Sequence, residues 1–114
     1  MTHALNPDPV RRGQLRRMNT TIAGPLVVAV VSSDEMHEAT SRAIIARVTA
    51  DAEAADTGVS VPIPPGFGAD GWVMPDRLME VSQSRLGEKA LAALPPATIY
   101  HLDLALAVVL GTRH

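Results

Sequence analysis

Two residues of one predicted strand have side chains that could act together on a phosphate group. Arg47 and Thr49 stand two positions apart at the end of the stretch Arg42–Val48. Because side chains alternate along a strand, both are expected on the face that also carries Ile45. A guanidinium can neutralise the charge of an attacked phosphate, and a hydroxyl can donate to it. We therefore take Arg47 and Thr49 as a candidate pair for binding a phosphate. The alternatives are a surface arginine and a hydroxyl bonded to nearby backbone.

Four further polar residues could bind the same kind of anionic ligand. Ser32 and Ser33 end the apolar stretch Leu26–Val31, while Arg77 and Arg85 lie in later loop-like segments. The alternative for the two serines is turn formation, and for the two arginines simple solvation. They are candidate binding residues for such a ligand.

Three ring-bearing residues also have two interpretations. His37 lies between the two strands and could act as an acid or base, but we expect it to be solvated. Trp72 and Phe67 could stack on bases. Because the chain has one Trp, one Tyr and one Phe, we expect Trp72 to belong to the core.

The elements that position these residues are mostly short strands. Continuous Val-rich Leu26–Val31 is typical of a strand buried on both faces, and Pro25 is tolerated at its start. Asp34 is expected to cap a helical turn over Glu35–Ala39. Two further strands are expected at sheet edges, over Gly13–Asn19 and Val59–Ile63, and another strand is expected over Arg42–Val48. Trp72–Met74 and Leu78–Val81 are expected to form either two strands or one strand bent at Pro75. Lys89–Leu94 fits either a strand or a helix, and Thr20–Gly24 is turn-like.

The C-terminal segment Pro96–Leu110 is the clearest predicted helix. Prolines suit its first turn and Gly111 its end. Ile99, Leu102, Leu106 and Val109 recur at helical spacing, with Leu110 beside them. Strands followed by one helix predict a mainly β fold, a small SH3-like antiparallel barrel with a helix packed on it.

Length and composition limit the remaining possibilities. A chain of 114 residues is expected to form one domain over 11–114, after an irregular tail over 1–10. With no cysteine and four scattered histidines, we expect no metal site and no cofactor. The apolar runs are too short to span a bilayer, so we expect no membrane partner and a cytoplasmic location. The first 33 residues carry four arginines against one acid, a basic segment that could touch phosphates or be solvated.

Several short motifs occur in a characteristic order. They are Val30-Val31-Ser32-Ser33-Asp34, Arg47-Val48-Thr49-Ala50, Gly71-Trp72-Val73-Met74-Pro75-Asp76-Arg77, Arg85-Leu86-Gly87 and Leu106-Ala107-Val108-Val109-Leu110-Gly111. Over Pro25–Gly111 this order resembles the MazF/PemK family of toxin endoribonucleases. The resemblance implies a homodimeric toxin of a type II toxin–antitoxin pair that cleaves single-stranded mRNA at specific sequences without a metal, and a cognate antitoxin as partner. It places the family's catalytic hydroxyl at Thr49 and makes Ser32, Ser33, Arg77 and Arg85 candidate RNA-binding residues.

The chain departs from the family pattern at the site itself. The family's catalytic Arg before Pro is Gly24 here, shifted by about two positions, and the Pro before the catalytic Thr is Arg47. The Arg after the family's Asp-Gln-Val lines up with Met79. The opening strand retains only Arg11-Arg12-Gly13-Gln14-Leu15 of the usual Arg-Arg-Gly-Glu-Leu-Trp start. We therefore expect Arg47 to replace the missing arginine. The alternative is a MazF-like or CcdB-like barrel that binds antitoxin, RNA or gyrase without cutting RNA.

Overall fold

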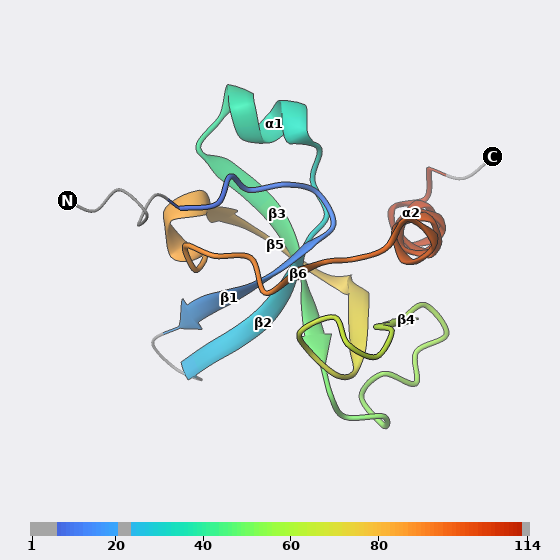
Figure 1. Cartoon of the computed structure of the whole chain (residues 1–114). Helices are drawn as coiled ribbons and strands as arrows, with labels where there is room; N and C mark the ends of the chain where they lie inside the picture. The colour runs from blue at the N-terminus through green and yellow to red at the C-terminus, as the bar shows by residue number, and fades with distance from the viewer. Residues whose placement is uncertain (1–6, 21–23, 113–114) are drawn as a thin grey trace.

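The computed structural model of the chain describes residues 7–20 and 24–112, and it is dominated by strands (Figure 1). The regular elements, in chain order, are β1 (Gln14–Thr20), β2 (Gly24–Val30), α1 (Asp34–Ala39), β3 (Arg42–Thr49), β4 (Val61–Pro62), β5 (Trp72–Ser82), the 3-10 turn η2 (Gln83–Arg85), β6 (Ala92–Ala93) and α2 (Pro96–Leu110). The predicted mainly β fold with a C-terminal helix is confirmed. The predicted tail over 1–6 and the turn at 21–23 lie outside the described residues.

All six strands form one antiparallel sheet in the order β4-β5-β3-β2-β1-β6. The sheet curls into a half-barrel because its strands are strongly twisted (Figure 1). The expected edge position of the first strand was wrong, since β1 pairs with β2 on one side and with β6 on the other. The edge position of the Val59–Ile63 strand is confirmed, although only Val61 and Pro62 pair.

Each face of the sheet carries its own apolar cluster. One cluster includes Leu15, Ala29, Ala46 and Val73 and packs against α2 through Leu102. The other includes Met18, Val28, Val30 and Ile45 on the opposite face. The division follows from alternation, since Val28 and Ala29 are neighbours in β2 yet belong to different clusters.

The C-terminal helix has the predicted bounds. Pro96 occupies its first turn, and Gly111 ends it at a φ of 71°, where the glycine N–H bonds to the Ala107 and Val108 carbonyls. Leu102 is buried, and Ile99 and Leu106 pack against the core. Leu110, predicted to share this face, is exposed instead.

The N-terminal strap, Pro7–Val10, has no regular secondary structure but is held against the body. The Asp8 N–H donates to the Glu88 carbonyl at 2.7 Å. The Asp8 carboxylate accepts from the Ala90 N–H at 3.0 Å, which lowers the pKa of that carboxyl, and it lies 3.6 Å from the Lys89 amine. The strap thereby closes one side of the half-barrel.

Candidate active site

The candidate catalytic residues lie where β3 pairs with β5. Arg47 lies opposite Met74, and Thr49 lies opposite Trp72. The residues between them, Val48 and Val73, belong to the α2-side core. Because alternate residues point to opposite faces, Arg47 and Thr49 point away from that core, on one face, as predicted.

A bulge in β5 forms a cavity over these residues. Ala46 pairs with Leu78, but the next residue, Arg47, pairs with Met74, so three residues of β5 are left unpaired. Pro75 has no N–H to lose at such a position. The cavity, of about 130 Å³, is lined by Arg47, Val48, Thr49, Ala54, Met74 and Arg77. The structure therefore brings Arg77, which the sequence singled out separately, to the pair formed by Arg47 and Thr49.

The Thr49 hydroxyl is oriented by the turn that follows it. Its oxygen accepts a hydrogen bond from the Asp51 N–H at 3.1 Å. That contact uses a lone pair and leaves the hydroxyl hydrogen available to a ligand oxygen. Thr49 thus presents a donor at the cavity while part of its acceptor capacity is already satisfied.

The two cavity arginines have no acidic partner. Within residues 7–20 and 24–112, neither Arg47 nor Arg77 makes a hydrogen bond or an ion pair, and both are exposed. Most other basic side chains are engaged, for example Arg42 with Glu80 at 3.2 Å and Arg12 with Asp103. Two unpaired guanidinium groups beside one small cavity favour an anionic ligand.

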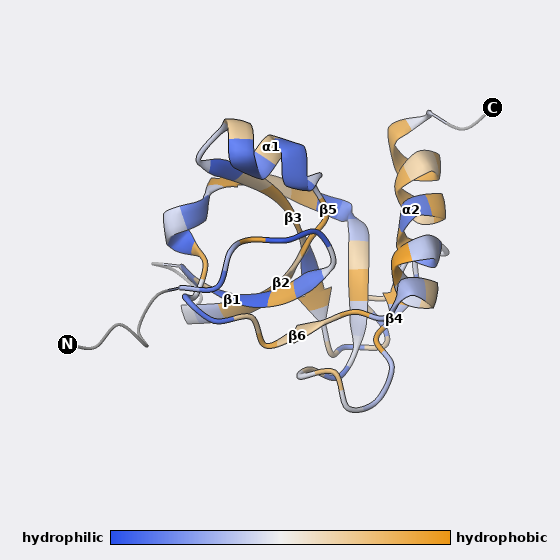
Figure 2. Cartoon of the chain, turned by 45° about the horizontal axis from the view of Figure 1, so that its top comes forward, coloured by the Kyte–Doolittle hydropathy of each residue, from blue (hydrophilic) through white to orange (hydrophobic). Residues whose placement is uncertain are grey.

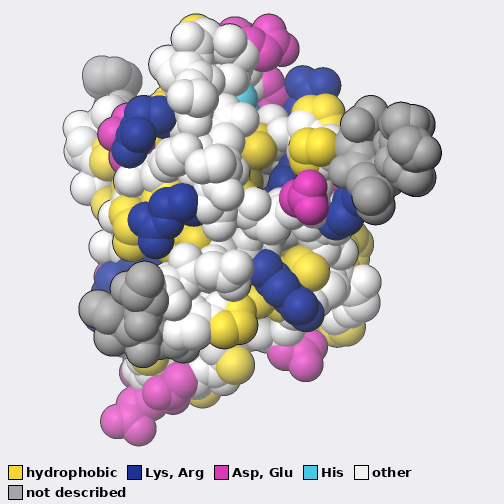
Figure 3. Space-filling model, turned by 90° about the vertical axis from the view of Figure 1, so that its left-hand side faces the viewer, with side chains coloured by type: hydrophobic (Ala, Val, Ile, Leu, Met, Phe, Trp, Pro, Cys, Tyr) yellow, Lys and Arg dark blue, Asp and Glu magenta, His cyan; other side chains and the backbone are white. Residues whose placement is uncertain are grey.

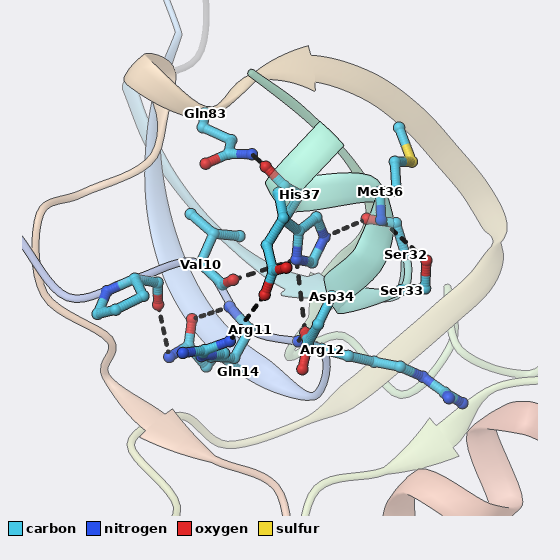
Figure 4. Close-up of polar contacts among 12 residues, drawn as sticks. Val10, Arg11, Arg12, Gln14, Ser32, Ser33, Asp34, Met36, His37 and Gln83 are labelled. Carbon is cyan, nitrogen blue, oxygen red and sulfur yellow. Dashed lines mark hydrogen bonds and ion pairs between the residues drawn. The ribbon is translucent and has the colours of Figure 1, made fainter. Parts of the chain in front are cut away.

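The two predicted serines lie at the far end of β3 and have structural partners (Figure 4). Ser33 caps α1 by accepting the Met36 N–H at 3.2 Å, which corrects the predicted cap at Asp34. Ser32 is buried and accepts the Ile44 N–H at 2.9 Å. Ile44 precedes Thr49 by five residues, roughly 16 Å along a strand. The structure therefore does not bring the serines into the Arg47 cavity.

His37 is buried, contrary to the expectation of a solvated side chain (Figure 4). Its Nδ1 lies 3.1 Å from the Val10 carbonyl, which can only accept, so Nδ1 carries the proton. Its Nε2 then accepts from the Ser32 hydroxyl at 2.6 Å. These bonds tie α1 to the segment that follows β2 and to the N-terminal strap, a role that sequence spacing alone did not indicate.

Arg85 and Arg16 lie on the side of the molecule away from α2. Figure 3 shows several separate Lys and Arg side chains on this side. Arg85 is exposed and lies in η2, which follows the C-terminal end of β5. That end of β5 pairs with Arg42, at the opposite end of β3 from Thr49, so Arg85 lies away from Thr49. Arg16 is only 1% exposed, and it donates to the Gly87, Asp8 and Pro9 carbonyls at 2.6 to 2.8 Å. Burial lowers the pKa of Arg16, and its position in the basic N-terminal run gave no sign of this structural role.

The comparisons with known proteins agree with this architecture. Residues 10–110 match the family model described as PemK-like, MazF-like toxin of type II toxin-antitoxin system. The chain belongs to this family. No curated protein sequence matches it. Among solved structures, an endoribonuclease in complex with its cognate antitoxin from a mycobacterial species is 25% identical, with a TM-score of 0.82 over 92% of this chain and 98% of that one.

Two further MazF structures show the same fold at lower identity. MazF in a MazE–MazF crystal structure from Deinococcus radiodurans is 23% identical, with a TM-score of 0.78 over 91% of this chain and 97% of that one. The Mycobacterium tuberculosis toxin MazF-mt6 is 13% identical, with a TM-score of 0.72 over 86% and 96%. This MazF-like chain thus keeps the whole fold while its sequence has diverged.

Gly24, which precedes Pro25 in this MazF-like protein, begins β2 and pairs with Thr20 of β1. Val28 pairs with Arg47, and the pairing of β2 with β3 stops there, short of the Thr49 end of β3. Gly24 has a φ of 72° and open space around it, so it contributes only backbone. The guanidinium groups at this end come instead from β3 and from the β5 bulge.

Among the described helices, none is long and apolar enough to cross a membrane. In residues 7–20 and 24–112, no group of three or more His, Asp or Glu side chains is arranged to hold a metal ion.

Proposed function

We propose that this protein is the toxin of a type II toxin–antitoxin pair and that it cleaves single-stranded mRNA at specific sequences. The observation that carries the proposal is the cavity in which Arg47, Thr49 and Arg77 meet, with both guanidinium groups unpaired. Its volume suits one phosphate group and its immediate linkage. A mycobacterial relative that shares the fold at 25% identity is named an endoribonuclease.

The cleavage follows from the chemistry of the substrate's own 2′-hydroxyl. As this hydroxyl loses its proton to water, its oxygen attacks the adjacent phosphorus and the bond to the 5′-oxygen breaks. The departing 5′-oxygen takes up a proton from water, and the products are a 2′,3′-cyclic phosphate and a 5′-hydroxyl. Arg47, together with Arg77 of the bulge, stabilises the charge that accumulates on the phosphorane oxygens. The Thr49 hydroxyl donates to the same group. In this proposal the Arg47 guanidinium replaces the one that the family carries before Pro25.

The test is a single-turnover assay on a long RNA in EDTA, followed by mapping of the RNA ends. Thr49→Ala and Arg47→Ala should each slow cleavage by about 100- to 1,000-fold, the usual effect of losing one preorganised donor. Arg47→Lys should recover part of the rate, because an ammonium cannot make a planar two-pronged contact. Arg42→Ala is the matched control, an exposed arginine of the same strand already paired with Glu80. Equal rates for Arg47→Ala and Arg42→Ala would reject the replacement while leaving the toxin assignment intact.

We also propose a cognate antitoxin as the protein partner and the cytoplasm as the place of action. The mycobacterial and Deinococcus relatives were solved in complex with their antitoxins. An acidic, partly disordered antitoxin tail would suit the unpaired arginines. Co-purification with the product of a neighbouring small reading frame would test the pairing, and Arg47→Ala with Arg77→Ala should weaken it.

We propose a homodimer because α2 exposes large apolar side chains. The apolar stretch Leu26–Val31 leaves little surface for a partner, since Val28 and Val30 are fully buried within the monomer. In contrast, Figure 2 shows apolar residues around most of α2. Tyr100, Leu104 and Val108, at helical spacing, are 61%, 48% and 48% exposed. A helix that is apolar on all sides is usually buried on all sides, and sedimentation at tens of micromolar tests whether a second copy covers it.

The second candidate function is binding without cleavage, and Gly24 is the observation that favours it. Gly24 lacks the side chain that the family uses for catalysis, so the site could retain RNA or antitoxin binding alone. No cleavage by the wild type, together with tight antitoxin binding, would select this alternative.

A further inference from the structure

The sole tryptophan of the chain lies beside the candidate catalytic hydroxyl. Trp72 pairs with Thr49 of β3 on one side and with Pro62 of β4 on the other. Directly opposed residues of antiparallel strands have Cβ atoms about 5 Å apart and point to the same face. The indole therefore projects from the same face of the sheet as Arg47 and Thr49, next to the cavity.

Trp72 is not a core residue, contrary to the sequence-based expectation. Its neighbour Val73 is fully buried in the α2-side core, so the indole of Trp72 must point the other way. Among the described residues, Trp72 belongs to neither apolar cluster, whereas Phe67 packs against the α2-side core. Trp72 is half-buried. A large aromatic side chain with unused surface at a site is typical of a binding residue.

We propose that Trp72 is a stacking platform for a nucleobase of the RNA whose phosphate occupies the Arg47–Arg77 cavity. The inference rests on the proposed RNA substrate and adds a base contact to it. The cavity is lined by cationic, hydroxyl and apolar side chains and by no aromatic ring. It can therefore bind the phosphate backbone of the RNA, but it has no surface on which a base could stack. A base is attached through the sugar to that backbone, and the adjacent indole supplies the flat apolar surface that every base can use.

This arrangement gives a specific division of tasks. The arginines bind any phosphate, whereas Trp72 requires a base on the neighbouring nucleotide. Stacking tolerates all four bases. Trp72 should therefore raise the affinity for base-bearing single strands relative to abasic strands, without selecting a sequence by itself. Losing one such contact lowers affinity by about 5- to 150-fold.

The experiment uses the full-length protein and the fluorescence of Trp72, which has no other tryptophan to obscure it. The probe is a random-sequence 2′-O-methyl RNA 12-mer, which cannot cleave itself, and an abasic strand of equal length is the comparison. The base-bearing strand should quench Trp72 and bind more tightly than the abasic strand. By anisotropy, Trp72→Ala should weaken its binding by about 5- to 150-fold, and Trp72→Phe by less. Leu110→Ala, at an exposed apolar residue at the end of α2, is the control and should bind as the wild type does.

The outcomes separate this inference from the proposed function. If RNA cleavage depends on Thr49 but Trp72→Ala and Trp72→Phe both bind as tightly as the wild type, the stacking role is overturned and the nuclease stands. Equal binding of abasic and base-bearing strands would also overturn it. Quenching and a Trp72→Ala defect without cleavage by the wild type would support stacking while rejecting catalysis. Absence of any binding by the wild type would overturn both.

Discussion

A substitution at Gly71 should displace the candidate catalytic residue Thr49 through a backbone contact. It precedes Trp72 and has a φ of 121°, a conformation that L side chains rarely adopt. A Cβ added there would lie 2.1 Å from the Thr49 carbonyl oxygen and 2.9 Å from the Ala50 Cα. Both are backbone atoms, so Gly71→Ala must displace the segment that carries the candidate catalytic hydroxyl.

The expected cost has two parts that a control variant can separate. The positive φ costs about 1–2 kcal/mol, and forcing a methyl into filled space costs roughly 1–3 kcal/mol more. At roughly 4 °C per kcal/mol for a domain of this size, the Tm of Gly71→Ala should fall by about 8–20 °C. Gly66 has a φ of 87° but nothing within 4 Å of an added Cβ, so Gly66→Ala should lose only about 4–8 °C.

The assay is thermal unfolding followed by circular dichroism, with RNA cleavage measured well below both transitions. Gly71→Ala should cleave more slowly even where it is folded, because the Thr49 hydroxyl has moved, while Gly66→Ala should retain the wild-type rate. Equal Tm values for the two variants would refute the close-contact argument. A destabilised Gly71→Ala protein with wild-type cleavage would refute the link between this contact and Thr49.

Three further predictions concern stability and assembly. Leu102→Asp places an unpaired charge in the core and should abolish cooperative unfolding, whereas Leu104→Asp should keep the fold but shift sedimentation toward monomer. Arg16→Met removes donors from three carbonyls of the strap and its neighbours, and should lower the free energy of unfolding in urea by about 2–3 kcal/mol. The pKa of Asp8 is lower in the folded protein than in the unfolded chain, so the ionised carboxylate stabilises the fold. This contribution to the free energy of unfolding is present above the ordinary carboxyl pKa and is lost as the pH falls through the folded-state pKa. The urea midpoint should therefore drop less between pH 5 and pH 3 in Asp8→Asn than in the wild type.

Patterns local to the sequence predicted the elements well. The Pro96–Leu110 helix was found with its actual bounds, because proline and glycine mark its two ends. Alternation placed Arg47 and Thr49 on one face correctly. The choice between two strands and one bent strand around Pro75 is now settled as a single interrupted β5.

Features that depend on distant pairing could not be predicted. The burial of Arg16 requires the strap and Gly87, which are far from one another in sequence. The side on which Trp72 lies depends on the register with β3, which hydropathy does not reveal. The meeting of Arg77 with Thr49 depends on the three-residue bulge, for which Pro75 was only a general sign of irregularity.

The bulge has an evolutionary consequence. Because Ala46 pairs with Leu78 and Arg47 with Met74, deletion of Pro75–Arg77 would join Met74 to Leu78 and leave both flanking pairings in register. The face taken by every other β5 residue would be unchanged, and the loss would be the buried Pro75 ring and the Arg77 side of the cavity. A lineage could therefore gain or lose this second arginine through one nine-nucleotide insertion or deletion, with the sheet and the Thr49–Trp72 pair inherited intact.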